Sequence, residues 1–142
     1  MKDELQIYID GACAGNPGEA AIGVIVKQNN KKIKEISKAI GPATNNIAEY
    51  SALVEALKEA ALLKAEKIRI YTDSELLFKQ ITGQYKIKNE NLKLLFEEAK
   101  GLAEKLKAVE IKQIPREQNS AADQVASKAL KKRQAKMVAF PP

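Results

Sequence analysis

The chain begins with a strict alternation of hydrophobic and polar side chains. Leu5, Ile7 and Ile9 occupy one side of the pattern, and Gln6, Tyr8 and Asp10 occupy the other. A period of two is typical of a β-strand, in which successive side chains point to opposite faces. The pattern therefore predicts a strand over residues 5–10 that carries Asp10 on the face away from the aliphatic side chains.

Two more apolar runs follow, separated by turn-forming residues. Residues 11–19 are rich in Gly, Ala and Asn-Pro-Gly, which predicts the end of the first strand and a turn. Residues 20–27 and 32–40 predict a second and a third strand joined by a hairpin turn, and Gly41-Pro42 is expected to end the third strand. Three strands joined by tight turns form an antiparallel meander.

The spacing changes to a helical period after residue 44. Thr44, Asn45 and Asn46 offer capping side chains for a helix over about residues 47–64, and Glu49 lies on the apolar stripe of that helix. Further along we expect a strand at 67–72, a helix at 75–82, a strongly periodic helix at 91–107, a strand at 109–114 and a last helix after Asn119-Ser120. This alternation predicts an α/β fold: a mixed sheet with helices on both faces.

The composition limits the chemistry that the chain can perform. The sequence has no histidine and a single cysteine, Cys13, which excludes histidine-dependent catalysis and an intrachain disulfide. Acid/base or metal chemistry must therefore use carboxylates. The sequence shows no basic-then-apolar leader, and no apolar run reaches the ~18 residues that a membrane span requires. We therefore expect a cytoplasmic protein without a membrane partner, and a monomer.

The basic residues are concentrated in two segments. The formal net charge of +6 favours a polyanionic partner. Residues 27–38 carry five lysines and one glutamate, and residues 128–136 carry four lysines and one arginine without an acid. These two segments hold more than the whole positive excess, so the rest of the chain is close to neutral.

Four acids stand at special places in the predicted elements. Asp10 lies on the first strand, Glu49 on the first helix, Asp73 at the end of the fourth strand and Asp123 in the first turn of the last helix. Each has a plainer interpretation: a turn former, a solvated edge residue, a helix cap and a helix-dipole partner, respectively. If the first and fourth strands are neighbours, however, Asp10 and Asp73 lie side by side. Clustered carboxylates require cations, and all-oxygen ligands favour Mg²⁺ or Mn²⁺.

Four motifs resemble those of the type 1 ribonuclease H family. They are YIDGACAGNPGEAAIGVIV, TNNIAEY, IYTDSELLFKQI and PREQNSAADQVASKAL, in the family's order and spacing over about residues 5–130. The resemblance implies a five-stranded sheet of order 3-2-1-4-5 with an antiparallel second strand. It also implies a catalytic domain over residues 1–133, followed by a tail at 134–142. The implied activity is hydrolysis of the RNA strand of RNA–DNA hybrids, with two Mg²⁺ or Mn²⁺ ions, to 5′-phosphate and 3′-hydroxyl ends.

The resemblance also assigns the site residues. It makes Asp10, Glu49, Asp73 and Asp123 the catalytic, metal-binding carboxylates, and we expect Asp123 to be more peripheral than Asp10 and Asp73. It places Asn16, Asn45 and Asn46 against sugars and base edges of the hybrid minor groove, and Thr44 in a phosphate pocket. Further expected substrate contacts are Gly11, Cys13, Ser74, Lys86, Lys88 and Asn89.

The chain departs from the family pattern at two places. The loop before the last acid lacks the histidine that helps product release in many members, and Arg116 and Glu117 are the candidates to replace it. The segment 83–92 is too short for the family's basic, aromatic handle, and Tyr85, Lys86, Lys88 and Asn89 remain for that role. An alternative function is therefore a module that binds hybrid or double-stranded RNA with little turnover.

The last residues carry a different resemblance. Gln134, Met137 and Phe140 stand at positions i, i+3 and i+6, which resembles the sliding-clamp interaction box of archaeal and eukaryotic replication proteins, with Pro141 in place of a second aromatic residue. The alternatives are that this tail packs on the core of its own domain or that it is frayed. A clamp partner would raise the local concentration of the protein at its substrate.

Overall fold

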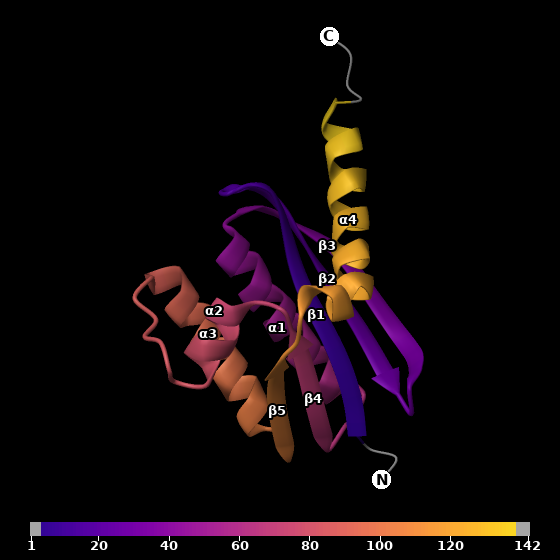
Figure 1. The fold of residues 1–142 in the computed structure, drawn as a ribbon, viewed down its shortest axis with the longest axis vertical. Coiled ribbons are helices and arrows are strands. Elements are labelled where there is room, and N and C mark those ends of the chain that lie inside the picture. Colours follow the sequence, from indigo (N-terminus) through magenta and orange to yellow (C-terminus); the bar gives the residue numbers. More distant parts are fainter. Residues whose placement is uncertain (1–3, 139–142) are drawn as a thin grey trace.

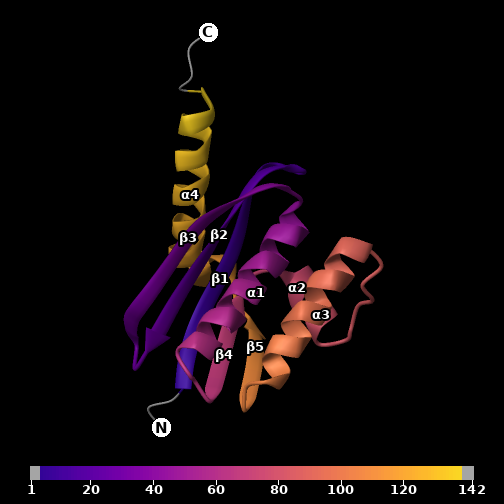
Figure 2. The ribbon, with the colours of Figure 1, turned by 180° about the vertical axis from the view of Figure 1, so that it is seen from behind.

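Five strands form one mixed sheet in the order β3-β2-β1-β4-β5 (Figures 1 and 2). The computed structural model describes residues 4–138. The strands are β1 (Glu4–Gly15), β2 (Gly18–Gln28), β3 (Lys31–Ala43), β4 (Lys67–Thr72) and β5 (Ala108–Gln113). β2 is antiparallel to both of its neighbours, whereas β1, β4 and β5 are parallel. The predicted fold class and strand order are confirmed.

Helices cover both faces of the sheet. On one face lie α1 (Asn45–Leu62), α2 (Glu75–Ile81) and α3 (Glu90–Glu104); on the other, a 3₁₀ turn (η1, Arg116–Asn119) leads into α4 (Ser120–Val138), which packs over β1, β2 and β3. Thr44, Ser74 and Asn89 cap α1, α2 and α3 by accepting hydrogen bonds from the N–H three residues later. No helix within residues 4–138 is both long and apolar enough to span a membrane.

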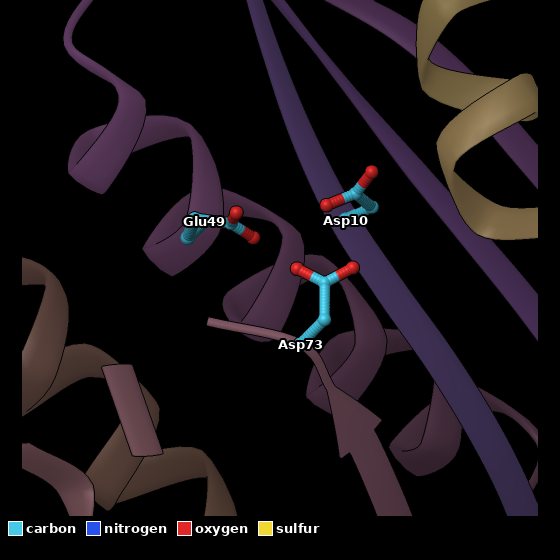
Figure 3. Close-up of side chains that lie close together, drawn as sticks. All are labelled: Asp10, Glu49 and Asp73. Carbon is cyan, nitrogen blue, oxygen red and sulfur yellow. The ribbon is translucent and has the colours of Figure 1, made fainter. Parts of the chain in front are cut away.

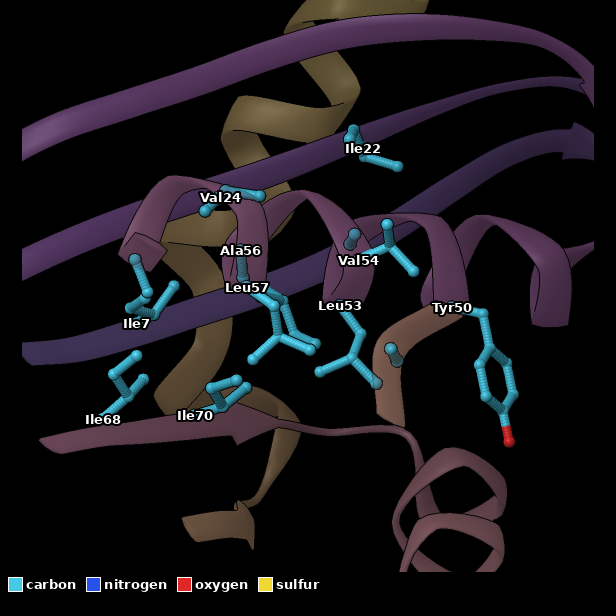
Figure 4. Close-up of a cluster of buried hydrophobic side chains, with 14 of the residues drawn as sticks. Ile7, Ile22, Val24, Tyr50, Leu53, Val54, Ala56, Leu57, Ile68 and Ile70 are labelled. Carbon is cyan, nitrogen blue, oxygen red and sulfur yellow. The ribbon is translucent and has the colours of Figure 1, made fainter. Parts of the chain in front are cut away.

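The core lies between the sheet and α1. Aliphatic side chains of β1, β2 and β4 meet the apolar stripe of α1, and most of them are fully buried (Figure 4). They include Ile7, Ile9, Ile22, Val24, Ile70, Leu53 and Leu57. The alternation predicted for residues 5–10 is therefore correct, because the same three aliphatic side chains of β1 face this core. Burial of such side chains is the main favourable contribution to folding.

The meander is longer than the sequence predicts. β1 continues past residue 10 to Gly15, because residues 11–15 extend the antiparallel pairing with β2 up to the Gly15–Gly18 pair. Gly41-Pro42 does not end β3, which runs on to Ala43. β3 is an edge strand, so a proline is tolerated there, and Ile40 is accommodated by a shift of the β2–β3 register.

The last helix crosses the predicted domain boundary at residue 133. α4 runs without a break to Val138, and the side chain of Gln134 is exposed. The side chain of Met137 and the whole of Phe140 lie outside the described residues, so the clamp motif stays a prediction. The other differences are local: α3 ends at Glu104 instead of residue 107, and η1 was not predicted.

Gly23 lets α4 approach the sheet closely. A Cβ atom at Gly23 would clash with the carbonyl oxygen of Ala122 and lie 2.6 Å from the backbone nitrogen of Ala126. Gly23 pairs with Asp10 across the β1–β2 ladder. The contact therefore sets the N-terminal turn of α4, which carries Asp123, beside the strand that carries Asp10.

We predict that Gly23→Ala destabilises the protein, because the new methyl group meets backbone atoms that cannot rotate away. The expected loss is about 1–3 kcal/mol in the free energy of unfolding, measured by urea denaturation. Gly101→Ala is the matched control: Gly101 lies in α3, and beyond the adjacent backbone of that helix no atom lies within 4 Å of the added Cβ. That control should gain about 0.5–1 kcal/mol. Equal effects of the two substitutions would contradict the close approach of α4.

Candidate active site

Asp10 and Asp73 are brought together by the parallel pairing of β1 and β4. The last paired residues of these strands are Tyr8 and Tyr71, whose rings stack with centroids 4.6 Å apart. Each acid stands two residues beyond that pair, Asp10 within β1 and Asp73 directly after the end of β4. Because both acids follow the same residue pair by two positions, both carboxylates lie at the same end of these two parallel strands.

Glu49 reaches the same place from α1. A Cβ atom on Gly11 would lie only 2.7 Å from the backbone of Ala48 and Glu49, so this helix approaches β1 where the strand has a glycine. The N–H of Gly11 donates a hydrogen bond of 3.1 Å to the Glu49 carboxylate. Carboxylate oxygens of Asp10, Glu49 and Asp73 consequently all lie within 4.8 Å of one another (Figure 3).

Asp123 stands beside this group in the first turn of α4. It lines the same cleft as the other three acids, and its carboxyl group contributes to the raised pKa of Asp10. It is not one of the three residues whose oxygens lie mutually within 4.8 Å. The structure thus brings the four predicted acids to one cleft, with Asp123 at its side.

The remaining predicted contacts divide into two groups. The cleft, of about 480 Å³, is lined by Asp10, Gly11, Ala12, Cys13, Asn45, Asn46, Glu49, Asp73, Ser74, Arg116 and Asp123. The residues that do not line it are Asn16, Thr44, Lys86, Lys88, Asn89 and Glu117. Among the latter, Asn16 contacts a lining residue, because its side-chain oxygen accepts a 3.0 Å hydrogen bond from the N–H of Asn45.

Two interpretations from the sequence change with the structure. Ser74, not Asp73, caps α2, so the carboxylate of Asp73 is free of that role. Asn89 caps α3, and the exposed Lys86 and Lys88 lie in the short linker before it. The predicted contact of these linker residues with a nucleic acid stays a prediction.

Asn119, for which the sequence predicts only a place at the start of the last helix, is a site residue. Its side chain is 1% exposed, and its amide donates hydrogen bonds to the carbonyl of Ile9 at 2.8 Å and to the Asp73 carboxylate at 3.2 Å. It therefore fixes Asp73 relative to the residue before Asp10. No pattern in the sequence reveals this role, because a four-residue 3₁₀ turn is too short to show a periodicity.

The crowding of acids changes their protonation. Burial raises the pKa of Asp10 to about 8, and the charge of Asp73 and the hydrogen bond with Asp123 add to this effect. Burial also raises the pKa of Glu49 well above its usual value, with further contributions from Asp10 and Asp73, while the Gly11 N–H and Arg116 act in the opposite direction. A cation is therefore needed to hold this cluster fully ionised at neutral pH.

Comparison with known proteins gives close relatives. Residues 8–129 match the family described as reverse transcriptase-like. The bifunctional protein Rv2228c of Mycobacterium tuberculosis is 36% identical over 126 residues, covering 87% of this chain and 35% of the relative. The ribonuclease HI of Halobacterium salinarum is 40% identical over 124 residues, covering 87% and 62%. The chain thus spans about a third of the length of Rv2228c and less than two thirds of the length of the Halobacterium salinarum protein.

A solved structure agrees over nearly its full length. LC11-RNase H1, isolated from compost and solved in complex with an RNA/DNA hybrid, is 34% identical to this chain and superposes with a TM-score of 0.87. The match covers 92% of this chain and 99% of that one.

We predict that the metal-free protein loses stability as the pH rises from about 4 to about 8, because folded Asp10 keeps a proton that the unfolded chain has released. Asp10→Asn should remove much of this dependence. At pH 8 it should raise the melting temperature by about 4 °C or more, equivalent to about 1 kcal/mol, with little change near pH 4.

Thermal denaturation in the presence of a chelator measures this effect. Glu97→Gln, at an exposed position of α3 for which the structure describes no ion pair, is the control and should behave as the wild type at each pH. If the stability of Asp10→Asn depended on pH as that of the wild type does, the Asp10 carboxyl group would not be the source of the pH dependence.

Proposed function

The chain belongs to the type 1 ribonuclease H family, and on that premise we propose that it is an endoribonuclease that hydrolyses the RNA strand of RNA–DNA hybrids. The observation that carries the proposal is the group of three carboxylates with oxygens within 4.8 Å of one another, beside a fourth acid in the same cleft. The hybrid bound to LC11-RNase H1 supports this substrate class.

The acids fit divalent metal ions of the hard type. The cluster offers only oxygen ligands, and its mutual repulsion is relieved by positive charge. Asp10, Glu49 and Asp73 would hold Mg²⁺ or Mn²⁺, with Asp123 completing the site at its side. When bound, two such ions would supply Lewis-acid stabilisation of the charge that develops on the phosphate and on the leaving 3′ oxygen.

The cleft also offers groups for the substrate. Asn45 and Asn46 line it at the N-terminus of α1, and their amides suit the acceptors that every base pair presents in the minor groove. Such contacts detect shape without reading sequence, and the 2′-hydroxyl marks the strand that is RNA. Hybrid binding should therefore be nearly independent of sequence.

Arg116 is the better of the two candidates for the position of the missing loop histidine. It lines the cleft and lowers the pKa of Glu49, whereas Glu117 lies outside the lining. A guanidinium does not lose its proton, so Arg116 would bind a phosphate oxygen and would not transfer a proton. Product release would then depend on an electrostatic contact with the 5′-phosphate.

We predict cleavage of a labelled RNA–DNA hybrid into products with 5′-phosphate and 3′-hydroxyl ends when Mg²⁺ or Mn²⁺ is added, and no cleavage in a chelator. Gel electrophoresis of the two separately labelled strands measures the activity, with the DNA strand as an internal control. Binding without cleavage under both metals would contradict an enzyme and favour the alternative of a binding module.

The place of each acid in the site predicts a graded response to substitution. Asp73→Asn should abolish cleavage, because this carboxylate faces both Asp10 and Glu49. Asp123→Asn should keep measurable activity in Mn²⁺, with a loss of about 10- to 100-fold as for groups that support a metal site. Initial rates on one hybrid measure both variants, and equal residual rates would contradict the peripheral position of Asp123.

A further inference from the structure

The two lysine-rich segments of the sequence form one surface in the structure. Ser37 of β3 donates a 2.7 Å hydrogen bond to the carbonyl of Val125, which fixes α4 against the edge strand. Three adjoining hollows lie between or along these elements. Their basic lining residues, here named the basic surface, are Lys27, Lys32, Lys128, Lys131, Lys132 and Arg133.

The basic surface keeps an excess of positive charge. Glu35 forms ion pairs with Lys32 at 2.8 Å and with Lys128 at 3.5 Å, and Glu19 pairs with Arg133 at 3.5 Å. Lys131 and Lys132 are exposed and form no ion pair within residues 4–135. Exposed lysines of this kind contribute little to folding, so their charge is available to a partner.

The basic surface adjoins the catalytic cleft. Asp123 lines both the cleft and the hollow formed by Lys128, Lys131 and Lys132. These lysines recur on the same side of α4, and a rise of 1.5 Å per residue places Lys132 about 14 Å along the helix from Asp123. Phosphates along one strand follow one another every ~3.4 Å of duplex axis, so this stretch of α4 could face several phosphates.

We propose that the basic surface binds backbone phosphates of the same hybrid where it extends beyond the catalytic cleft. The identity of the nucleic acid rests on the proposed function; the location of the contact rests on the charges of α4. The hollow along α4 has no aromatic lining residue, so it does not offer the ring stacking used to bind unpaired bases. The surface would offset the short linker between α2 and α3, which provides few basic contacts.

The double variant Lys131→Gln/Lys132→Gln tests the proposal. The matched control is Lys105→Gln/Lys107→Gln, which removes the same charge from exposed positions after α3; none of the four lysines forms an ion pair within residues 4–135. Dissociation constants are measured in a chelator, without turnover, for a long hybrid of about 30 base pairs over a series of salt concentrations.

The expected result is a rise of about 3- to 10-fold in the dissociation constant for the long hybrid, and a log–log salt slope reduced by about 1 to 2. The affinity of the control variant and its salt dependence should match the wild type. Equal weakening in the control variant would overturn the proposal, as would unchanged binding of the long hybrid by the double variant. Binding is measured without metal and therefore does not depend on cleavage. A failure of cleavage would refute the proposed function, and the binding data would still show whether the basic surface contacts the hybrid.

Discussion

Mutual repulsion of carboxylates is the constraint around which this structure is built. Asp10, Glu49 and Asp73 come from a strand, a helix and a strand end, and their oxygens lie within 4.8 Å of one another. Without structural constraints or bound cations, these carboxylates would move apart or take up protons. Backbone contacts prevent the separation: β1 pairs with β4, α1 approaches β1 at Gly11, and α4 approaches β2 at Gly23. The amide of Asn119 then ties Asp73 to β1.

Basic side chains of the protein lie beside the acidic cleft. The acids occupy the cleft at the junction of β1, β4 and α1, while the lysines of β2, β3 and α4 lie beside it. Arg116 is the basic residue of the cleft lining itself. An acidic centre next to a basic surface suits a polyanionic substrate, because cations can neutralise the acids where the reaction takes place and the lysines can hold the rest of the backbone.

Much of this organisation could be predicted from the sequence. The alternation in residues 5–10, the cap of α1 and the four acid motifs are local signals, and the order of the motifs matches a known family. Asn119 was not predicted as a positioning residue, because its role depends on Ile9 and Asp73, which are distant in sequence. The extension of β3 through Pro42 was not predicted, because Gly41-Pro42 is a strong local turn signal, although the implied strand order already placed the third strand at an edge, where a proline is tolerated. The meeting of residues 27–38 with α4 likewise depends on tertiary contacts.

The fold holds the acid cluster in place for divalent cations, and without them the crowded carboxyl groups stay partly protonated. Calorimetric titration with Mn²⁺ at pH 7, in buffers of different ionisation enthalpy, counts the protons released on binding. With the pKa of Asp10 raised to about 8, most molecules hold a proton there before the metal arrives. We predict the release of about 0.5 to 1 proton or more per protein molecule. Metal binding without proton release would contradict the account.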